Sequence, residues 1–190
     1  MRHLFLLFVY LVLAEKDELS NINELLTELF QRRIYEKHAT PLNDRSEQIE
    51  VRLAFVIAKI IDLDTRTAIL TMDAELPCKW KDEHLFWVPQ IFGGIETLTL
   101  KYDEIWRPPI SLYFIAADSS HSSKFEPHNL LLSYTGEVSW WPQVSLKTYC
   151  EIDLSNFPFD AHVCNLHVSI PEDASRVNLT TLNPGCESVT

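Results

Sequence analysis

The sequence predicts an all-β fold class, an immunoglobulin-like antiparallel β-sandwich preceded by one N-terminal α-helix. The helix is indicated between Asp17 and Arg33, where six apolar residues recur at helical spacing and leave a polar face. After Ile49 the period changes to two, most clearly in Leu70–Leu76, where apolar and polar residues alternate without a break. Short segments of this kind, separated by turn-forming residues, are typical of two packed sheets.

The predicted strands follow one another at nearly regular spacing through the rest of the chain. They are Val51–Ile61, Leu70–Leu76, Ile95–Leu100, Pro109–Phe114, Leu130–Tyr134, Val138–Tyr149 and Asn165–Ile170. Turn signals such as Gly93-Gly94 and Thr135-Gly136 lie between them. Because the sequence shows no internal repeat and no second set of elements, we expect a single domain.

The first fourteen residues are predicted to be a secretory signal peptide, which leaves residues 15–190 for the domain. Arg2 and His3 precede an apolar run of eleven residues that ends at Ala14. A membrane-spanning helix needs about 20 apolar residues, so this run is too short to cross a bilayer. We expect the chain in the secretory pathway and then at the extracellular face of the plasma membrane, or secreted if it ends at Thr190.

Composition and motifs narrow the possible functions. The net charge of −11 disfavours nucleic acid as a partner, and 46% hydrophobic residues suffice for a substantial core. The sequence contains no GxSxG, phosphate-loop, HExxH or CxxC motif, so we predict no enzyme, no catalytic residues, no cofactor and no metal site. The sequon Asn178-Leu179-Thr180 predicts N-glycosylation of Asn178 on a surface loop.

A loop bracketed by two cysteines is the most informative segment. The chain has four cysteines, which in an exported protein can oxidise in three different pairings. Cys150 and Cys164 enclose thirteen residues between two predicted strands, and a disulfide there would stabilise the folded domain by roughly 3 kcal/mol. Phe157 and Phe159 flank Pro158 in this loop. Since an apolar tip is unfavourable in water, we expect it to dock on another surface.

The segment CEIDLSNFPFDAHVC, from Cys150 to Cys164, resembles the signature loop of the Cys-loop ligand-gated ion channels. Further resemblances run in the family order: Trp80–Trp87 resembles WxDxxLxW, Gly93-Gly94-Ile95 the turn after it, and Glu104–Tyr113 the segment IWxPDIxLY. The resemblance covers about Ile49 to Leu182. It implies the extracellular ligand-binding domain of a nicotinic acetylcholine receptor-like subunit, which gates ion conductance when joined to a pore.

The resemblance also implies roles for individual loop residues and for partners. It pairs Cys150 with Cys164 in a disulfide and places a cis peptide bond before the loop proline. The coupling loop that would contact the pore comprises Phe157, Pro158, Phe159 and Asp160. The implied partners are other receptor subunits, in a homo- or hetero-pentamer, and a small cationic neurotransmitter bound between subunits.

A transmitter cage of aromatic residues is implied only in part. A quaternary ammonium ion is bound by several ring faces, each contributing roughly 0.5–2 kcal/mol. By the resemblance, Tyr113 is the first contributing tyrosine and Trp140 an aromatic position of the complementary face. Two family positions are altered, because Glu75 replaces the complementary tryptophan, and Ile170 or Pro171 replaces a cage tryptophan after the second loop cysteine. We therefore expect an incomplete cage.

Two alternatives follow from the C-terminal end of the sequence. By the resemblance, Thr190 precedes the last strands and the transmembrane region, so we expect a membrane connection only through a missing pore domain or through partner subunits. The alternative is a secreted soluble binding or assembly module without channel activity. Cys78 and Cys186 match no family position, and we assign them no pairing.

Overall fold

The computed structural model describes residues 18–44, 46–113, 128–169 and 176–182. Residues 18–26 form an α-helix that continues as the π-helical segment η1 (Thr27–Arg32), and η2 (Pro89–Phe92) is a short 3₁₀ helix. The strands are β1 (Ile49–Leu53), β2 (Val56–Asp64), β3 (Ile69–Glu75), β4 (Cys78–Lys81), β5 (Thr97–Leu100), β6 (Ser111–Tyr113), β7 (Leu130–Ser133), β8 (Glu137–Trp140), β9 (Gln143–Glu151), β10 (Val163–Cys164), β11 (His167–Ser169) and β12 (Val177–Thr181).

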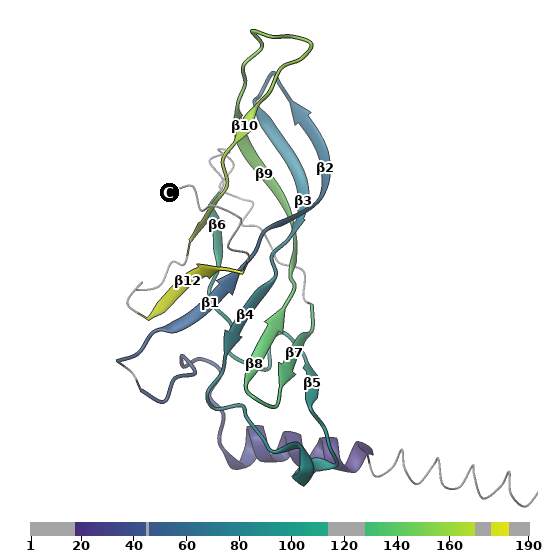
Figure 1. Cartoon of the computed structure of the whole chain (residues 1–190), viewed down its shortest axis with the longest axis vertical. Helices are drawn as coiled ribbons and strands as arrows, with labels where there is room; N and C mark the ends of the chain where they lie inside the picture. Colours follow the sequence, from purple (N-terminus) through teal and green to yellow (C-terminus); the bar gives the residue numbers. More distant parts are fainter. Residues whose placement is uncertain (1–17, 45, 114–127, 170–175, 183–190) are drawn as a thin grey trace, which may run out of the picture.

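The strands form an elongated sandwich with the helix at one end (Figure 1). One sheet has the order β12-β1-β4-β8-β7-β5, a second the order β10-β9-β3-β2, and β11 pairs with β6 in a small third sheet. The predicted all-β sandwich with one N-terminal helix is confirmed. One pair of neighbouring strands, β1 with β12, runs parallel, although the sequence predicts antiparallel pairing throughout.

The N-terminal helix closes one end of the core. Leu25 and Leu29 are fully buried, and Ile22, Leu26 and Phe30 pack against the same core. These are five of the six apolar positions that predict the helix from the sequence, because residues three and four apart lie on one helical face. The sixth position, Leu19, is 61% exposed. The described helix begins at residue 18, so Asp17, the predicted first residue, lies outside the described part.

Two predicted strands are each split where the chain passes from one large sheet into the other. Val51–Ile61 divides into β1 and β2, and Val138–Tyr149 divides into β8 and β9 at Trp141-Pro142. Proline has no backbone N–H and interrupts a ladder. At this junction the carbonyls of Pro77 and Pro142 instead accept hydrogen bonds from Ala54 N at 2.9 Å and Leu76 N at 3.0 Å. Both predicted strands therefore begin in the six-stranded sheet and continue in the four-stranded sheet.

Three strands are missing from the sequence prediction, namely β4, β10 and β12. Strand β10 is only two residues long, and β4 follows β3 after two intervening residues. The other predictions agree with the structure in position, and β9 shows the expected alternation, with every second side chain from Val144 to Cys150 buried. Phe114 and Ile170, the predicted last residues of two strands, lie outside the described part.

The turn between β7 and β8 packs against the loop after β4. Gly136 has a φ of +86°, and its carbonyl accepts a hydrogen bond from Asp82 N at 2.8 Å. The Asp82 carboxylate is fully buried and accepts hydrogen bonds from the Tyr35 hydroxyl at 2.6 Å and from His84 N at 2.9 Å. This polar cluster links the segment after the helix to the sheet. Burial raises the pKa of Asp82 above its ordinary value.

Candidate functional site

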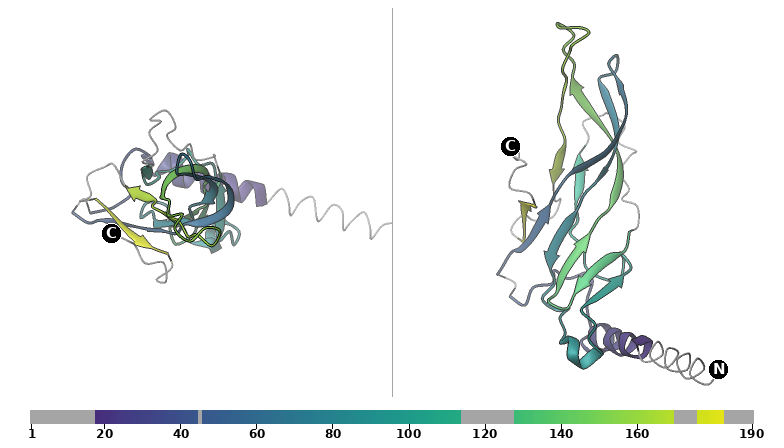
Figure 2. Two further views of the ribbon diagram at one scale, coloured as in Figure 1. Left: turned by 90° about the horizontal axis from the view of Figure 1, so that it is seen from above. Right: turned by 45° about the vertical axis from the view of Figure 1, so that its right-hand side comes forward.

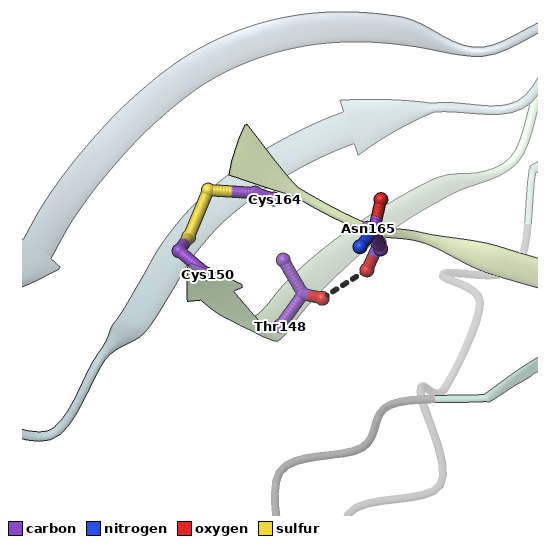
Figure 3. Close-up of a disulfide and its surroundings, with 4 residues drawn as sticks. All are labelled: Thr148, Cys150, Cys164 and Asn165. Atoms are coloured by element: carbon purple, nitrogen blue, oxygen red, sulfur yellow. Dashed lines mark hydrogen bonds between the residues drawn. A yellow bond between two sulfur atoms is a disulfide. The ribbon is translucent and has the colours of Figure 1, made fainter. Parts of the chain in front are cut away.

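The disulfide between Cys150 and Cys164 closes the loop at the end of the molecule opposite the helix (Figures 1 and 2). The two cysteines are directly paired across β9 and β10, with their Cα atoms 4.0 Å apart. Beside the disulfide, the buried Thr148 hydroxyl donates a hydrogen bond of 2.5 Å to the carbonyl of Asn165 (Figure 3). The stem of the loop is therefore held covalently and by hydrogen bonds from two adjacent strands.

The tip of this loop exposes two phenylalanines. The Phe157–Pro158 peptide bond is cis, in agreement with the family resemblance. The backbone turns back on itself through hydrogen bonds from Phe157 N to Leu154 O at 3.2 Å and from Phe159 N to Asn156 O at 2.8 Å. The exposed fractions of Phe157 and Phe159 are 76% and 90%. The expected apolar tip is thus present, and no described residue of this chain covers it.

Asp160 does not share this exposure. Its Oδ2 lies 2.8 Å from Nε2 of His162, and their side chains are only 16% and 12% exposed. On the other limb of the loop, Asp153 Oδ1 accepts a hydrogen bond of 2.9 Å from Ser155 N and another from the Ser155 hydroxyl. These hydrogen bonds lower the pKa of Asp153. Polar side chains therefore order both limbs and leave the aromatic tip projecting.

The turn between β2 and β3 lies at the same end of the molecule (Figures 1 and 2). Asp64 Oδ1 accepts hydrogen bonds from Arg66 N at 2.9 Å and Thr67 N at 3.3 Å, which is the ordinary way an aspartate stabilises a turn. The carbonyl of Ala68 then accepts a hydrogen bond from Cys150 N at 2.9 Å. The turn is thereby attached to the stem of the disulfide loop.

Three of the four candidate ligand-binding residues, Glu75, Tyr113 and Trp140, lie on three different strands. Glu75 ends β3, and its Oε1 accepts a hydrogen bond of 3.3 Å from Nε2 of Gln143 on β9. Tyr113 ends β6 with its backbone opposite His167. Trp140 ends β8 and is 2% exposed. Ile170 lies outside the described residues.

A contact of Trp140 with Arg107 is not predicted from the sequence. The guanidinium carbon of Arg107 lies 5.5 Å from the centre of the Trp140 ring and 4.8 Å from the centre of the Tyr102 ring. Thirty-eight positions separate the two aromatic residues (140 minus 102). No periodic pattern or motif joins residues so far apart, so this cluster is visible only in the fold.

Other candidate positions take ordinary structural environments. Cys78 is buried, its Sγ donates to the carbonyl of Leu76 at 3.0 Å, and burial raises the pKa of its thiol to about 12. Cys186 lies outside the described residues. Asn178 is exposed, but it lies on strand β12 and not on the expected surface loop. Within the described ranges, no group of His, Cys, Asp and Glu side chains is arranged to hold a metal ion. The same ranges contain no helix long and apolar enough to cross a membrane.

A sandwich with a terminal helix at one end and a disulfide-closed aromatic loop at the other defines the extracellular domain of a Cys-loop receptor. A family model described as the neurotransmitter-gated ion-channel ligand binding domain matches residues 22–183, and the chain belongs to this family. Family membership supports a non-enzymatic role.

Acetylcholine receptor subunits are among the similar curated proteins. The Xenopus laevis acetylcholine receptor subunit alpha-1-A is 32% identical over 165 residues, which is 86% of this chain and 34% of that subunit. The Carassius auratus neuronal acetylcholine receptor subunit non-alpha-2 is 30% identical over 175 residues, covering 92% and 36% of the two chains. The Manduca sexta acetylcholine receptor subunit alpha-like is 35% identical over 133 residues, covering 68% and 25%. The chain thus spans about a third of the length of the first of these relatives.

Proposed function

We propose that this chain is the extracellular domain of a nicotinic acetylcholine receptor-like subunit, and that its disulfide loop transmits ligand binding to a membrane pore. The observation that carries the proposal is the exposure of Phe157 and Phe159 on a loop whose stem is held by the disulfide. Fully burying a phenylalanine side chain contributes about 1.5–3 kcal/mol. Two such side chains therefore favour docking of the tip on an apolar partner surface.

The attachment of the β2–β3 turn to the loop stem supports a coupling role. The Ala68–Cys150 hydrogen bond and the β10–β9 pairing connect the loop to the four-stranded sheet. A displacement of that sheet moves the tip with it, because the disulfide prevents the two limbs of the loop from separating. The loop is therefore suited to passing a rigid-body movement to whatever surface the tip contacts.

Assembly with other receptor subunits is part of the proposal. Strand β2 is an edge strand of its sheet, and its apolar side chains Val56, Ile57, Ile60 and Ile61 are 45–60% exposed. An exposed apolar edge strand is a ready site for association. The relatives are named as receptor subunits, which agrees with assembly into a homo- or hetero-pentamer.

The proposed ligand is a small cationic neurotransmitter at a subunit interface, with the positions of Tyr113, Trp140, Glu75 and Ile170 as this chain's contributions. Glu75 supplies a carboxylate and no ring, and it is already hydrogen-bonded to Gln143. We therefore propose that most of the aromatic surface of a complete site comes from a neighbouring subunit.

A loop graft tests the coupling role. Residues 150–164 replace the corresponding loop of the Xenopus laevis alpha-1-A subunit, which is co-expressed in oocytes with its partner subunits. We expect acetylcholine-evoked currents within about tenfold of the parent receptor. Replacing both Phe157 and Phe159 by alanine in the graft should abolish most of the current while the number of receptors at the cell surface stays constant.

Val163→Ala is the matched control for the graft, because Val163 is 60% exposed in the same loop but lies on β10 and away from the tip. Its current should equal that of the unmodified graft. The coupling role is wrong if the graft reaches the surface and stays silent, or if the double phenylalanine variant conducts normally. Assembly is tested separately by co-purifying this chain with receptor subunits, and Ile60→Glu is expected to lower the amount of chain recovered with them.

A further inference from the structure

Arg107 lies between two aromatic rings from different parts of the chain. Its guanidinium carbon is 4.8 Å from the centre of the Tyr102 ring and 5.5 Å from the centre of the Trp140 ring. Both distances lie within the roughly 6 Å over which a ring face attracts a cation. None of the salt bridges among the described residues involves Arg107. The described environment of this cation is thus aromatic, with no acidic side chain in ion-pair contact.

The backbone next to Arg107 is held in place by its neighbours. Trp106 is 6% exposed and meets Trp80 of β4 edge to face, with ring centres 6.1 Å apart. The backbone N–H of Trp106 also donates a hydrogen bond of 3.0 Å to the Tyr35 hydroxyl. These contacts hold the residue before Arg107 in place, and from there the Arg107 side chain reaches the two rings.

The two rings are positioned independently of each other. Trp140 is 2% exposed at the end of β8, where its backbone pairs with Cys78 of β4. Tyr102 belongs to a turn in which Glu104 N donates to Lys101 O at 3.1 Å and Lys101 N donates to Glu104 Oε2 at 2.9 Å. Since separate elements hold the two rings, replacing Arg107 should leave both rings in position.

We infer that Tyr102 and Trp140 form a cation cage whose resident ion is Arg107, and that Arg107 determines whether the cage binds a small organic ammonium ion. The ring faces attract a guanidinium and a quaternary ammonium by the same quadrupole. Two cations inside the same cage would repel each other, so the cage holds one cation at a time. If the proposed receptor function holds, a transmitter that approaches Trp140 meets a cage already occupied by the Arg107 guanidinium of the same chain. Arg107 is then a specificity-determining residue.

Nuclear magnetic resonance of this chain labelled with ¹⁵N-tryptophan tests the inference without a receptor assay. The chain has five tryptophans, and the indole signal of Trp140 is assigned by its loss in Trp140→Phe. Each protein is titrated with tetramethylammonium chloride and, for ionic strength, with sodium chloride. We expect no saturable shift of the Trp140 signal in the wild type. In Arg107→Ala we expect a shift that saturates at about 1–100 mM tetramethylammonium and is absent with sodium.

Two further variants make the result specific. Tyr102→Ala combined with Arg107→Ala should weaken the tetramethylammonium response at least tenfold, because one wall of the cage is lost. Arg33→Ala is the matched control: Arg33 lies 4.8 Å over the single ring of Phe86 and also pairs with Glu28, so its removal should leave the Trp140 signal unresponsive.

The inference is overturned if folded Arg107→Ala shows no tetramethylammonium-dependent shift, or if the wild type responds equally. Should Arg107→Ala fail to fold, the wild type still decides. In the wild type, ring currents of Tyr102 and Trp140 should shift the side-chain δ protons of Arg107 upfield of those of Arg66. Arg66 has no ring contact among the described residues. Equal shifts for the two arginines would overturn the cage. These results do not depend on channel activity, so a failure here leaves the coupling proposal intact.

Discussion

Gly136 and Gly94 offer a pair of substitutions that separates backbone strain from steric overlap. Their φ angles are nearly equal, +86° and +85°. A Cβ added at Gly136 would lie 2.4 Å from the backbone oxygen of Asp82, whereas a Cβ added at Gly94 would meet no atom within 4 Å. Because Asp82 is buried and its N–H is bonded to Gly136 O at 2.8 Å, the obstructing backbone cannot withdraw without losing that hydrogen bond.

The expected losses of unfolding free energy follow from these contacts. A positive φ at alanine costs about 1–2 kcal/mol at either position. The overlap at Gly136 adds about 1–3 kcal/mol, as for an overpacked interior. Alanine also reduces the entropy of the unfolded chain, but this effect is common to both variants and cancels in their difference. We therefore expect Gly94→Ala to cost about 1–2 kcal/mol and Gly136→Ala about 2–5 kcal/mol.

Urea unfolding of the purified chain, followed by tryptophan fluorescence, measures both values by linear extrapolation. The comparison requires equal m-values, which show that both variants unfold in the same two-state manner. Equal losses for the two variants would refute the reasoning, because the overlap with Asp82 would then contribute nothing. A larger loss at Gly94 would contradict it more strongly.

Three further predictions concern the polar core, the disulfide and the glycan. Burial raises the pKa of Asp82 in the folded chain above the ordinary aspartate value of about 3.9. Between these two pKa values the folded chain therefore binds more protons than the unfolded chain. The stability of the wild type relative to Asp82→Asn should therefore fall as pH rises through that window, and a pH-independent difference in urea midpoints would contradict this. Replacing Cys150 and Cys164 together by serine should lower the unfolding free energy by about 3 kcal/mol, and chemically reduced wild type should match the variant. Wild type expressed through a eukaryotic secretory pathway should lose the mass of one N-glycan on peptide N-glycosidase treatment, whereas Asn178→Gln should be unaffected because the sequence contains no second sequon.

The helix and most strands follow from the sequence because side-chain direction depends on local backbone geometry. The apolar positions that predict the helix include Leu25 and Leu29, which are fully buried. The alternation along β9 likewise appears as alternate burial. The loop from Cys150 to Cys164 is visible in the sequence because its length and its Phe-Pro-Phe-Asp segment are contiguous. Features carried by contiguous residues can be predicted without knowing which strands become neighbours.

Pairings between distant segments are decided only by the tertiary structure. No local period relates the residues that pair in the parallel alignment of β1 with β12, or those joined by the hydrogen bond from Cys150 N to Ala68 O. The change of sheet at Trp141-Pro142 likewise depends on which strands become neighbours. The meeting of Arg107 with Tyr102 and Trp140 belongs to the same class. The sequence by itself determined the fold class, the helix and the aromatic loop, since each depends on local spacing. The contact of Arg107 with Trp140 depended on packing, because the connection between β5 and β6 that holds Tyr102 and Arg107 meets the end of β8 only in the folded chain.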